Sequence, residues 1–197
     1  MNGKLLVRDK IDYIYSPQNR FAMMKKLFGT LLFSLLFLPS IYAQIIIEPG
    51  KGINNLKIGS TPDEVVWEMA FKGIKLTKAG VPEVLKIQAD MLSMDFDYVY
   101  NYQHIMAIPV STVYFKNDKV VMIVVSSYPE YNEVLCLGVK TKEGLNFWDD
   151  EHAMKRIYGK KHETYQSDFD FHYYPELGLS VSIDDKQIRT MTIFKTQ

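Results

Sequence analysis

Two segments of the chain alternate polar and aromatic residues, a period of two that predicts strands with one buried face. The pattern Asp-Phe-Asp-Tyr-Val-Tyr at 95–100 returns as Asp-Phe-Asp-Phe-His-Tyr at 168–173. This repeat, at an offset of 73 residues, predicts that the two segments are equivalent strands of a duplicated unit. Each strand is expected to place its aromatic side chains on one face, which are Phe96, Tyr98, Tyr100 and Tyr102 in the first copy and Phe169, Phe171 and Tyr173 in the second.

A helix is predicted upstream of each strand, over about 62–72 and 148–158. In the first copy Ser60 or Thr61 is suited to the N-cap, and Thr61 with Glu64 has the spacing of a capping box. Asn146 is the candidate cap of the second helix. Gly73 and Gly159 lie where the two helices are expected to end.

The first helix carries apolar residues at helical spacing, which predicts a stripe that packs on the sheet. Its members are Val66, Trp67, Ala70 and Phe71. If Trp67 is part of the core, Trp67→Ala should cost about 3–5 kcal/mol of stability. The alternative is an exposed Trp67 that serves as a binding anchor.

Each predicted strand is followed by a hairpin, with turn residues Asn117-Asp118 in the first copy and Asp184-Asp185 in the second. The offset between the copies falls along the chain, which places extra residues in the first copy, where 82–92 is suited to a second short helix. The predicted fold is therefore α+β, with two tandem α-β-β-β units forming an antiparallel sheet with helices packed on one face.

The segment 23–43 has the order of a secretory signal peptide. Two lysines precede a 12-residue apolar run, and Pro39 and a small residue, Ala43, follow it. The run is shorter than the roughly 20 residues that span a bilayer. We therefore expect a periplasmic or secreted protein that is cleaved near Ala43, with translation starting at Met1, Met23 or Met24.

The expected organisation has five parts. They are a non-structural extension (1–22), the signal peptide (23–43), the first unit (44–126), a connection (127–145) and the second unit (146–197). Residues 1–43 hold six of the 23 basic and two of the 23 acidic residues, so cleavage leaves 17 basic and 21 acidic residues. This balance argues against a nucleic-acid partner. The single cysteine, Cys136, excludes a disulfide framework.

The stretch Ile-Gly-Ser-Thr-Pro-Asp-Glu-Val at 58–65, which opens the first α-β-β-β unit, resembles a motif of exported bacterial proteins. The chain is similar to the fold group of the β-lactamase-inhibitor proteins and the SmpA/OmlA outer-membrane-assembly lipoproteins. That resemblance implies a helix packed on a small antiparallel sheet, tandem copies of the unit, and binding roles without catalytic residues. The second copy lacks the Gly-Ser/Thr pair, and no cysteine lies at the cleavage point for a lipid anchor.

No catalytic signature, P-loop or dinucleotide fingerprint occurs in the sequence, and no cofactor is expected. The leading hypothesis is an exported, non-catalytic binding or accessory protein of the bacterial envelope. Its partner would be another envelope or extracellular protein, without nucleic acid and without a stable transmembrane span after cleavage. Tyrosine is enriched at interfaces, and the candidates for an exposed binding surface are Tyr128, Tyr131, Tyr173 and Tyr174.

Two further hypotheses remain open, an envelope hydrolase or metal-dependent enzyme that uses strand carboxylates, and a small-ligand-binding module. Asp168, Asp170 and His172 are expected on one strand face, where they are weak candidates for a cation site. A solvated strand face is the favoured interpretation of this pattern. Clustering of Asp95 and Asp97 with these residues would favour the enzyme. His162, in a polar connection, suggests no specific role.

Overall fold

The computed structural model describes residues 44–102, 110–127, 138–160, 162–166 and 169–196. The extension 1–22 and the predicted signal peptide 23–43 lie outside these ranges. Within them, no helix has the length and apolar character needed to cross a membrane.

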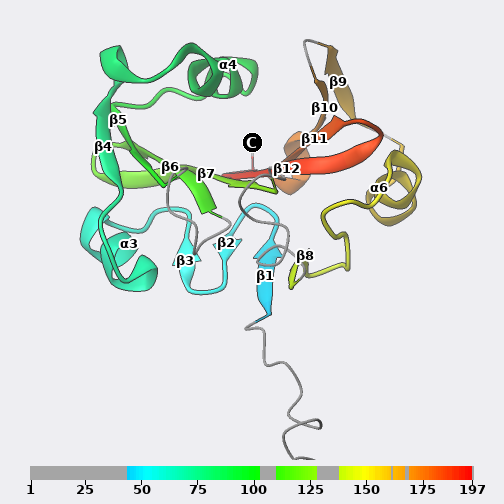
Figure 1. The fold of residues 1–197 in the computed structure, drawn as a ribbon, viewed down its shortest axis with the longest axis horizontal. Coiled ribbons are helices and arrows are strands. Elements are labelled where there is room, and N and C mark those ends of the chain that lie inside the picture. The colour runs from blue at the N-terminus through cyan, green and yellow to red at the C-terminus, as the bar shows by residue number, and fades with distance from the viewer. Residues whose placement is uncertain (1–43, 103–109, 128–137, 161, 167–168, 197) are drawn as a thin grey trace, which may run out of the picture. The chain divides into compact units, whose positions relative to one another are not determined.

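An eight-stranded antiparallel sheet forms the centre of the described structure, and the predicted α+β class is confirmed (Figure 1). The strand order is β4-β5-β6-β7-β12-β11-β10-β9. The strands are β4 (Ile74–Thr77), β5 (Tyr98–Asn101), β6 (Val110–Lys116), β7 (Lys119–Ser126), β9 (Glu163–Gln166), β10 (Asp170–Tyr174), β11 (Leu179–Asp184) and β12 (Gln187–Phe194).

This strand order reads the same from both edges, because the two repeats meet at β7 and β12. Val124 pairs directly with Thr192, its equivalent at an offset of 68 residues. Both hairpins have a two-residue turn with positive φ at both positions, at 117–118 and at 185–186. The second turn is thus one residue later than predicted. The register also shifts at equivalent places, beside Phe115 and Ile183.

Each repeat contains one more strand than predicted, an edge strand between the helix and the first expected strand. These strands are β4 and β9, which pair with β5 and β10. They are short and mostly exposed, so they lack the alternating pattern that marks a half-buried strand. The predicted extra helix of the first repeat is present as α4 (Glu83–Met91) and follows a short 3-10 turn, η1 (Lys78–Gly80).

The two repeat helices are α3 (Pro62–Met69) and α6 (Glu151–Tyr158). Thr61 caps α3, and its backbone N–H donates to Glu64 at 2.7 Å, which confirms the capping box. Asp150 caps α6 in place of the predicted Asn146, because its carboxylate accepts the N–H of Ala153. Gly159 ends α6 as predicted, whereas α3 ends earlier than Gly73.

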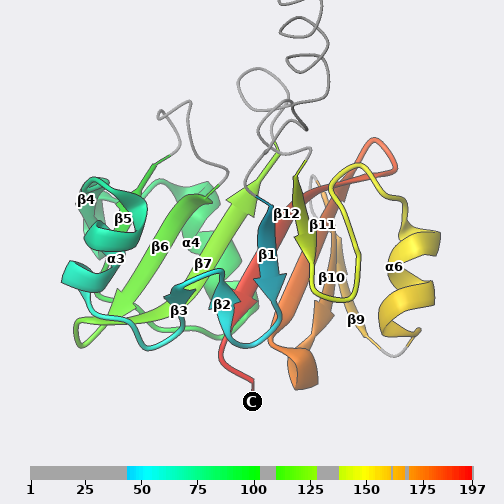
Figure 2. The same ribbon diagram turned by 90° about the horizontal axis from the view of Figure 1, so that it is seen from below.

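Both repeat helices pack on the same face of the sheet, as predicted, and α4 covers the opposite face. A second, four-stranded sheet shares the face with α3 and α6, as Figures 1 and 2 show. Its order is β3-β2-β1-β8, and β1 and β8 are parallel. Its strands are β1 (Ile45–Glu48), β2 (Gly52–Ile53), β3 (Leu56–Lys57) and β8 (Val139–Thr141).

The strands β5 and β10 are equivalent, but at an offset of 72 residues instead of the expected 73. Tyr98 pairs with Phe115, and Asp170 pairs with Ile183, the residue equivalent to Phe115. A slip of one residue turns every side chain to the other face. The aromatic residues of the two copies therefore face opposite sides: Tyr98 packs on the side of α3, and Tyr173 packs on the side of α4.

Phe96 does not share a face with Tyr98, contrary to the predicted pattern. It precedes β5 and packs in the cluster under α4, edge to face with Tyr114 at a centroid distance of 5.2 Å. The strand is thus shorter than the alternating segment that predicted it, because the chain enters the sheet only at Tyr98.

The core assignment of Trp67 is wrong, since its side chain is 84% exposed. The buried stripe of α3 consists of Val65 and Met69, which are four residues apart and so lie on one helix face. Trp67 lies between them in sequence and therefore on the other side of this two-turn helix. The alternative of an exposed tryptophan agrees with the structure.

A pair of substitutions in α3 tests this assignment. Met69→Ala should lower the free energy of unfolding by about 2–5 kcal/mol, because it opens a cavity under the helix. Trp67→Ala should change it by no more than about 0.5 kcal/mol, as exposed positions do. Urea unfolding measures both, and a large loss for Trp67→Ala would contradict the structure.

Candidate functional site: a polar pocket in the second repeat

A pocket of about 470 Å³ lies where α6 meets the strands of the second repeat. Glu151 enters it from the first turn of α6, and Lys155 from the next turn. His162 directly precedes the edge strand β9, and Asp170 and His172 lie two residues apart on β10, so their side chains share a face.

Three of these side chains converge. One ligating atom each of Glu151, His162 and His172 lies within 4.8 Å of the other two. His172 Nδ1 is 2.8 Å from His162 Nε2, and His172 Nε2 is 3.7 Å from Glu151 Oε1. Lys155 Nζ contacts the same Glu151 oxygen at 2.5 Å. His172 is only 4% exposed, so the centre of the group is buried.

The contacts favour one tautomer of the histidine pair. A protonated Nε2 of His172 facing Glu151 avoids repulsion between a ring lone pair and the carboxylate. His172 Nδ1 then accepts the Nε2–H of His162. This leaves His162 Nδ1 as a buried acceptor to which none of the described residues donates. An unpaired buried acceptor is costly, which indicates that the pocket offers a position for a further ligand.

The charge states agree with this arrangement. Burial lowers the pKa of His172, and the neighbouring His162 lowers it further, so the neutral form, whose Nδ1 accepts the hydrogen bond from His162, is favoured. The hydrogen bond from Lys155 lowers the pKa of Glu151 and keeps its carboxylate ionised. The pocket therefore presents the ionised carboxylate of Glu151 beside the neutral imidazole of His172.

The first repeat is an internal control, because it fills the equivalent space with aromatic rings. Tyr100 is the equivalent of His172. The rings of Tyr98 and Tyr100 pack on Phe115 at centroid distances of 4.9 and 4.8 Å, and Lys75 Nζ lies 3.8 Å from the centre of the Tyr98 ring.

The other two members of the group also have non-ligating equivalents. The edge strands and the helix caps match at an offset of 89 residues, which makes Gly73 the equivalent of His162 and Pro62 that of Glu151. A Cβ at Gly73 would lie 2.8 Å from Tyr102, so no side chain fits there. All three ligand-type residues are thus confined to the second repeat.

The structure unites two of the residues that the sequence had nominated. Asp170 and His172 both line the pocket, and Asp168 lies outside the described residues. His162 and Glu151 were missed as site residues, because the sequence places them in a connection and at a helix start. Alignment of the edge strands, which were not foreseen, would have been the signal that reveals them.

The exposure expected of Tyr173 and Tyr174 is wrong, because they are 7% and 3% exposed. They are the last two residues of β10, where one side chain packs on each covered face of the sheet. Tyr128 and Tyr131 lie outside the described residues.

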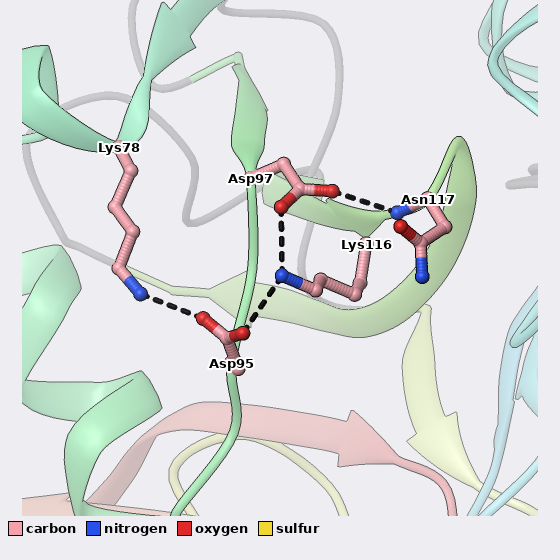
Figure 3. A network of polar contacts seen from close by, with 5 residues as sticks. All are labelled: Lys78, Asp95, Asp97, Lys116 and Asn117. Atoms are coloured by element: carbon pink, nitrogen blue, oxygen red, sulfur yellow. Dashed lines mark hydrogen bonds and ion pairs between the residues drawn. The ribbon is translucent and has the colours of Figure 1, made fainter.

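The carboxylates of the first repeat form ion pairs instead of a site. Figure 3 shows Asp95 between Lys78 and Lys116, at 2.6 and 2.7 Å, with Asp97 on the same Lys116 at 2.8 Å. Asp97 also accepts the backbone N–H of Asn117 and so fixes the hairpin turn. Four strands separate β5 from β10, so these carboxylates do not cluster with Asp170.

A wider hollow of about 840 Å³ lies beside β3 and the start of β7. It is lined by backbone, apolar groups and four lysines, which are Lys51, Lys57, Lys119 and Lys195. Among the described residues no carboxylate or imidazole lines it, so these residues form no convergent set of ligating groups comparable to that of the pocket.

No family model, curated protein or solved structure matches the chain. The similarity to the inhibitor-protein and lipoprotein fold group therefore remains a prediction, and the function is inferred from geometry.

The ion pairs of Figure 3 predict how Asp95 titrates. Lys116 and then Lys78 lower its pKa from 3.8 to about 2. Since the folded pKa lies below the unfolded one, the stabilisation is present above about pH 4 and is lost as the pH falls toward 2. Carboxyl NMR should show this pKa, and Lys116→Gln should raise it toward 3.8, whereas Lys51→Gln should not. An Asp95 that titrates near 3.8 in the unaltered protein would contradict the network.

Proposed function

We propose that the protein is an exported, non-catalytic binding protein whose ligand site is the pocket of the second repeat. One observation carries this proposal: the two repeats share strands, turns and register, yet one is filled with rings where the other holds Glu151, His162 and His172. A scaffold alone does not require this difference. Burying the polar side chain of His172 costs stability, and a buried titratable group beside a charge partner in a cleft is a candidate for a functional site.

Export rests on the segment 23–43, whose charged, apolar and small-residue order is typical of a signal peptide. A binding role is supported by a pocket whose volume suits a small ligand and whose walls combine both charges with imidazoles. The clustering of Asp95 and Asp97 with Asp170, which would have favoured the enzyme hypothesis, is not found among the described residues, because lysines of the first repeat hold Asp95 and Asp97.

A second candidate function is the docking of an envelope protein at the far end of the sheet. The observation in its favour is the exposure of two large apolar side chains there, Trp67 on α3 at 84% and Ile74 on β4 at 57%. Tryptophan is enriched among the residues that anchor interfaces. This candidate uses a surface that is separate from the pocket.

One NMR experiment tests both candidates. The ¹⁵N-labelled protein is mixed with the small-molecule fraction and, separately, the macromolecular fraction of its source organism's envelope extract. We expect the small-molecule fraction to shift amide signals of pocket residues such as Thr164 and His172. The variant His172→Tyr, which adopts the residue of the first repeat, should lose these shifts, while Trp67→Ala should keep them.

Two results would contradict the pocket as the binding site. The first is an absence of pocket shifts with the small-molecule fraction. The second is an unchanged response of His172→Tyr in a variant that folds by circular dichroism. Signal changes centred on Trp67 in the macromolecular fraction, lost in Trp67→Ala, would instead support the docking function.

A further inference from the structure

We propose that the second repeat binds a divalent first-row transition metal ion through Glu151, His162 and His172. This inference rests on the proposed function and names the class of ligand that the pocket takes. Each residue supplies one ligand, a carboxylate oxygen of Glu151 and a ring nitrogen of each histidine.

The ligand set selects the ion. Two imidazoles and one carboxylate suit zinc and its neighbours, whereas calcium and magnesium take oxygen ligands. Three protein ligands leave one position of a tetrahedral site for water or for a group of a further molecule. The pocket of about 470 Å³ provides space for that fourth ligand.

The required movement is small. Tetrahedral zinc with bonds of about 2.0–2.2 Å holds its ligand atoms roughly 3.4 Å apart, and the three atoms now lie within 4.8 Å of one another. Glu151 is 40% exposed at its side chain, and His162 lies in a connection, so two of the three ligands have freedom to close on His172, which the sheet fixes.

Lys155 supplies the positive charge that pairs with Glu151 in this structure. Its ammonium group contacts Glu151 at 2.5 Å, and its side chain is 31% exposed, so it has solvent into which it can withdraw. A bound metal ion would take over the neutralisation of Glu151 and would break the hydrogen bond between the histidines.

The alternative is that the three residues only support the fold. A structural histidine pair requires that its nitrogens be satisfied, but none of the described residues donates to His162 Nδ1. The first repeat, moreover, builds the same scaffold with Pro62, Gly73 and Tyr100 at the three equivalent positions. The fold therefore does not need the three ligands.

Calorimetric titration of the purified, untagged protein with zinc chloride tests the inference, with calcium and magnesium chloride as comparison. We expect one zinc ion per chain and no binding of the other two ions. Glu151→Gln and His172→Gln should each weaken zinc binding by about 100-fold or more, since removal of a mere supporting partner already costs 10- to 100-fold. Glu68→Gln, which removes the same charge from an exposed position of α3, should leave it unchanged.

Lys155→Gln provides a readout that a structural role would not move. It should lower the dissociation constant of zinc roughly two- to five-fold, because zinc no longer competes with a salt bridge for Glu151. If His172→Gln fails to fold, the zinc affinities of Glu151→Gln and Lys155→Gln still test the inference. Both substitutions change partly exposed side chains, which the fold tolerates more readily.

Absence of zinc binding would overturn the inference, and so would equal affinities of the unaltered protein and Glu151→Gln. The proposed function has a separate outcome. Pocket shifts in the NMR experiment together with a failed zinc titration would refute the metal and leave the pocket as the site of another ligand. Loss of the shifts after chelating resin has stripped the small-molecule fraction would support the metal.

Discussion

The pairing of β7 with β12 is the constraint on which the rest of the structure depends. It joins the last strands of the two repeats into one sheet, with Val124 opposite its equivalent Thr192. The strands contribute fully buried side chains such as Ile123 and Ile193. Equivalent residues of β7 and β12 pair directly, so their side chains point to the same face of the sheet. Both repeat helices are therefore placed on one side of the sheet.

The two repeats share one scaffold, so the features that occur in both can be distinguished from the features that occur in one. Turns, register shifts and helix positions recur in both repeats, since they determine how the chain enters and leaves the sheet. Among the described residues, the ring cluster around Phe115 lies in the first repeat and the group around His172 in the second. The first repeat gains stacking energy at this position, whereas the second buries the polar side chain of His172.

Much of this fold follows from local sequence patterns. The capping box of Thr61 and Glu64 and the turn at 117–118 were predictable, because caps and turn residues are local signals. The helix inserted in the first repeat was predictable from the falling offset between the two copies. The edge strands were not, because exposed short strands need no alternation.

The site was harder to predict for a related reason. Aromatic matching aligned Tyr98 with Phe171, one residue away from the true equivalence with Asp170, and a one-residue slip exchanges the two faces of a strand. The prediction that Trp67 lies in the core was wrong for a different reason. The helix α3 has only two turns, and its buried residues are Val65 and Met69. Sequence alone nominated Asp170 and His172, but their partners Glu151 and His162 come from elements whose packing only the structure shows.

Anomalous X-ray diffraction at the zinc edge, from crystals of the zinc-loaded protein, tests the central claim most directly. The claim is that the second repeat replaces aromatic packing by a metal-binding pocket. The account predicts one strong peak within about 2.0–2.2 Å of Glu151, His162 and His172. A map with no peak between these three residues, or with zinc only elsewhere on the surface, would contradict it.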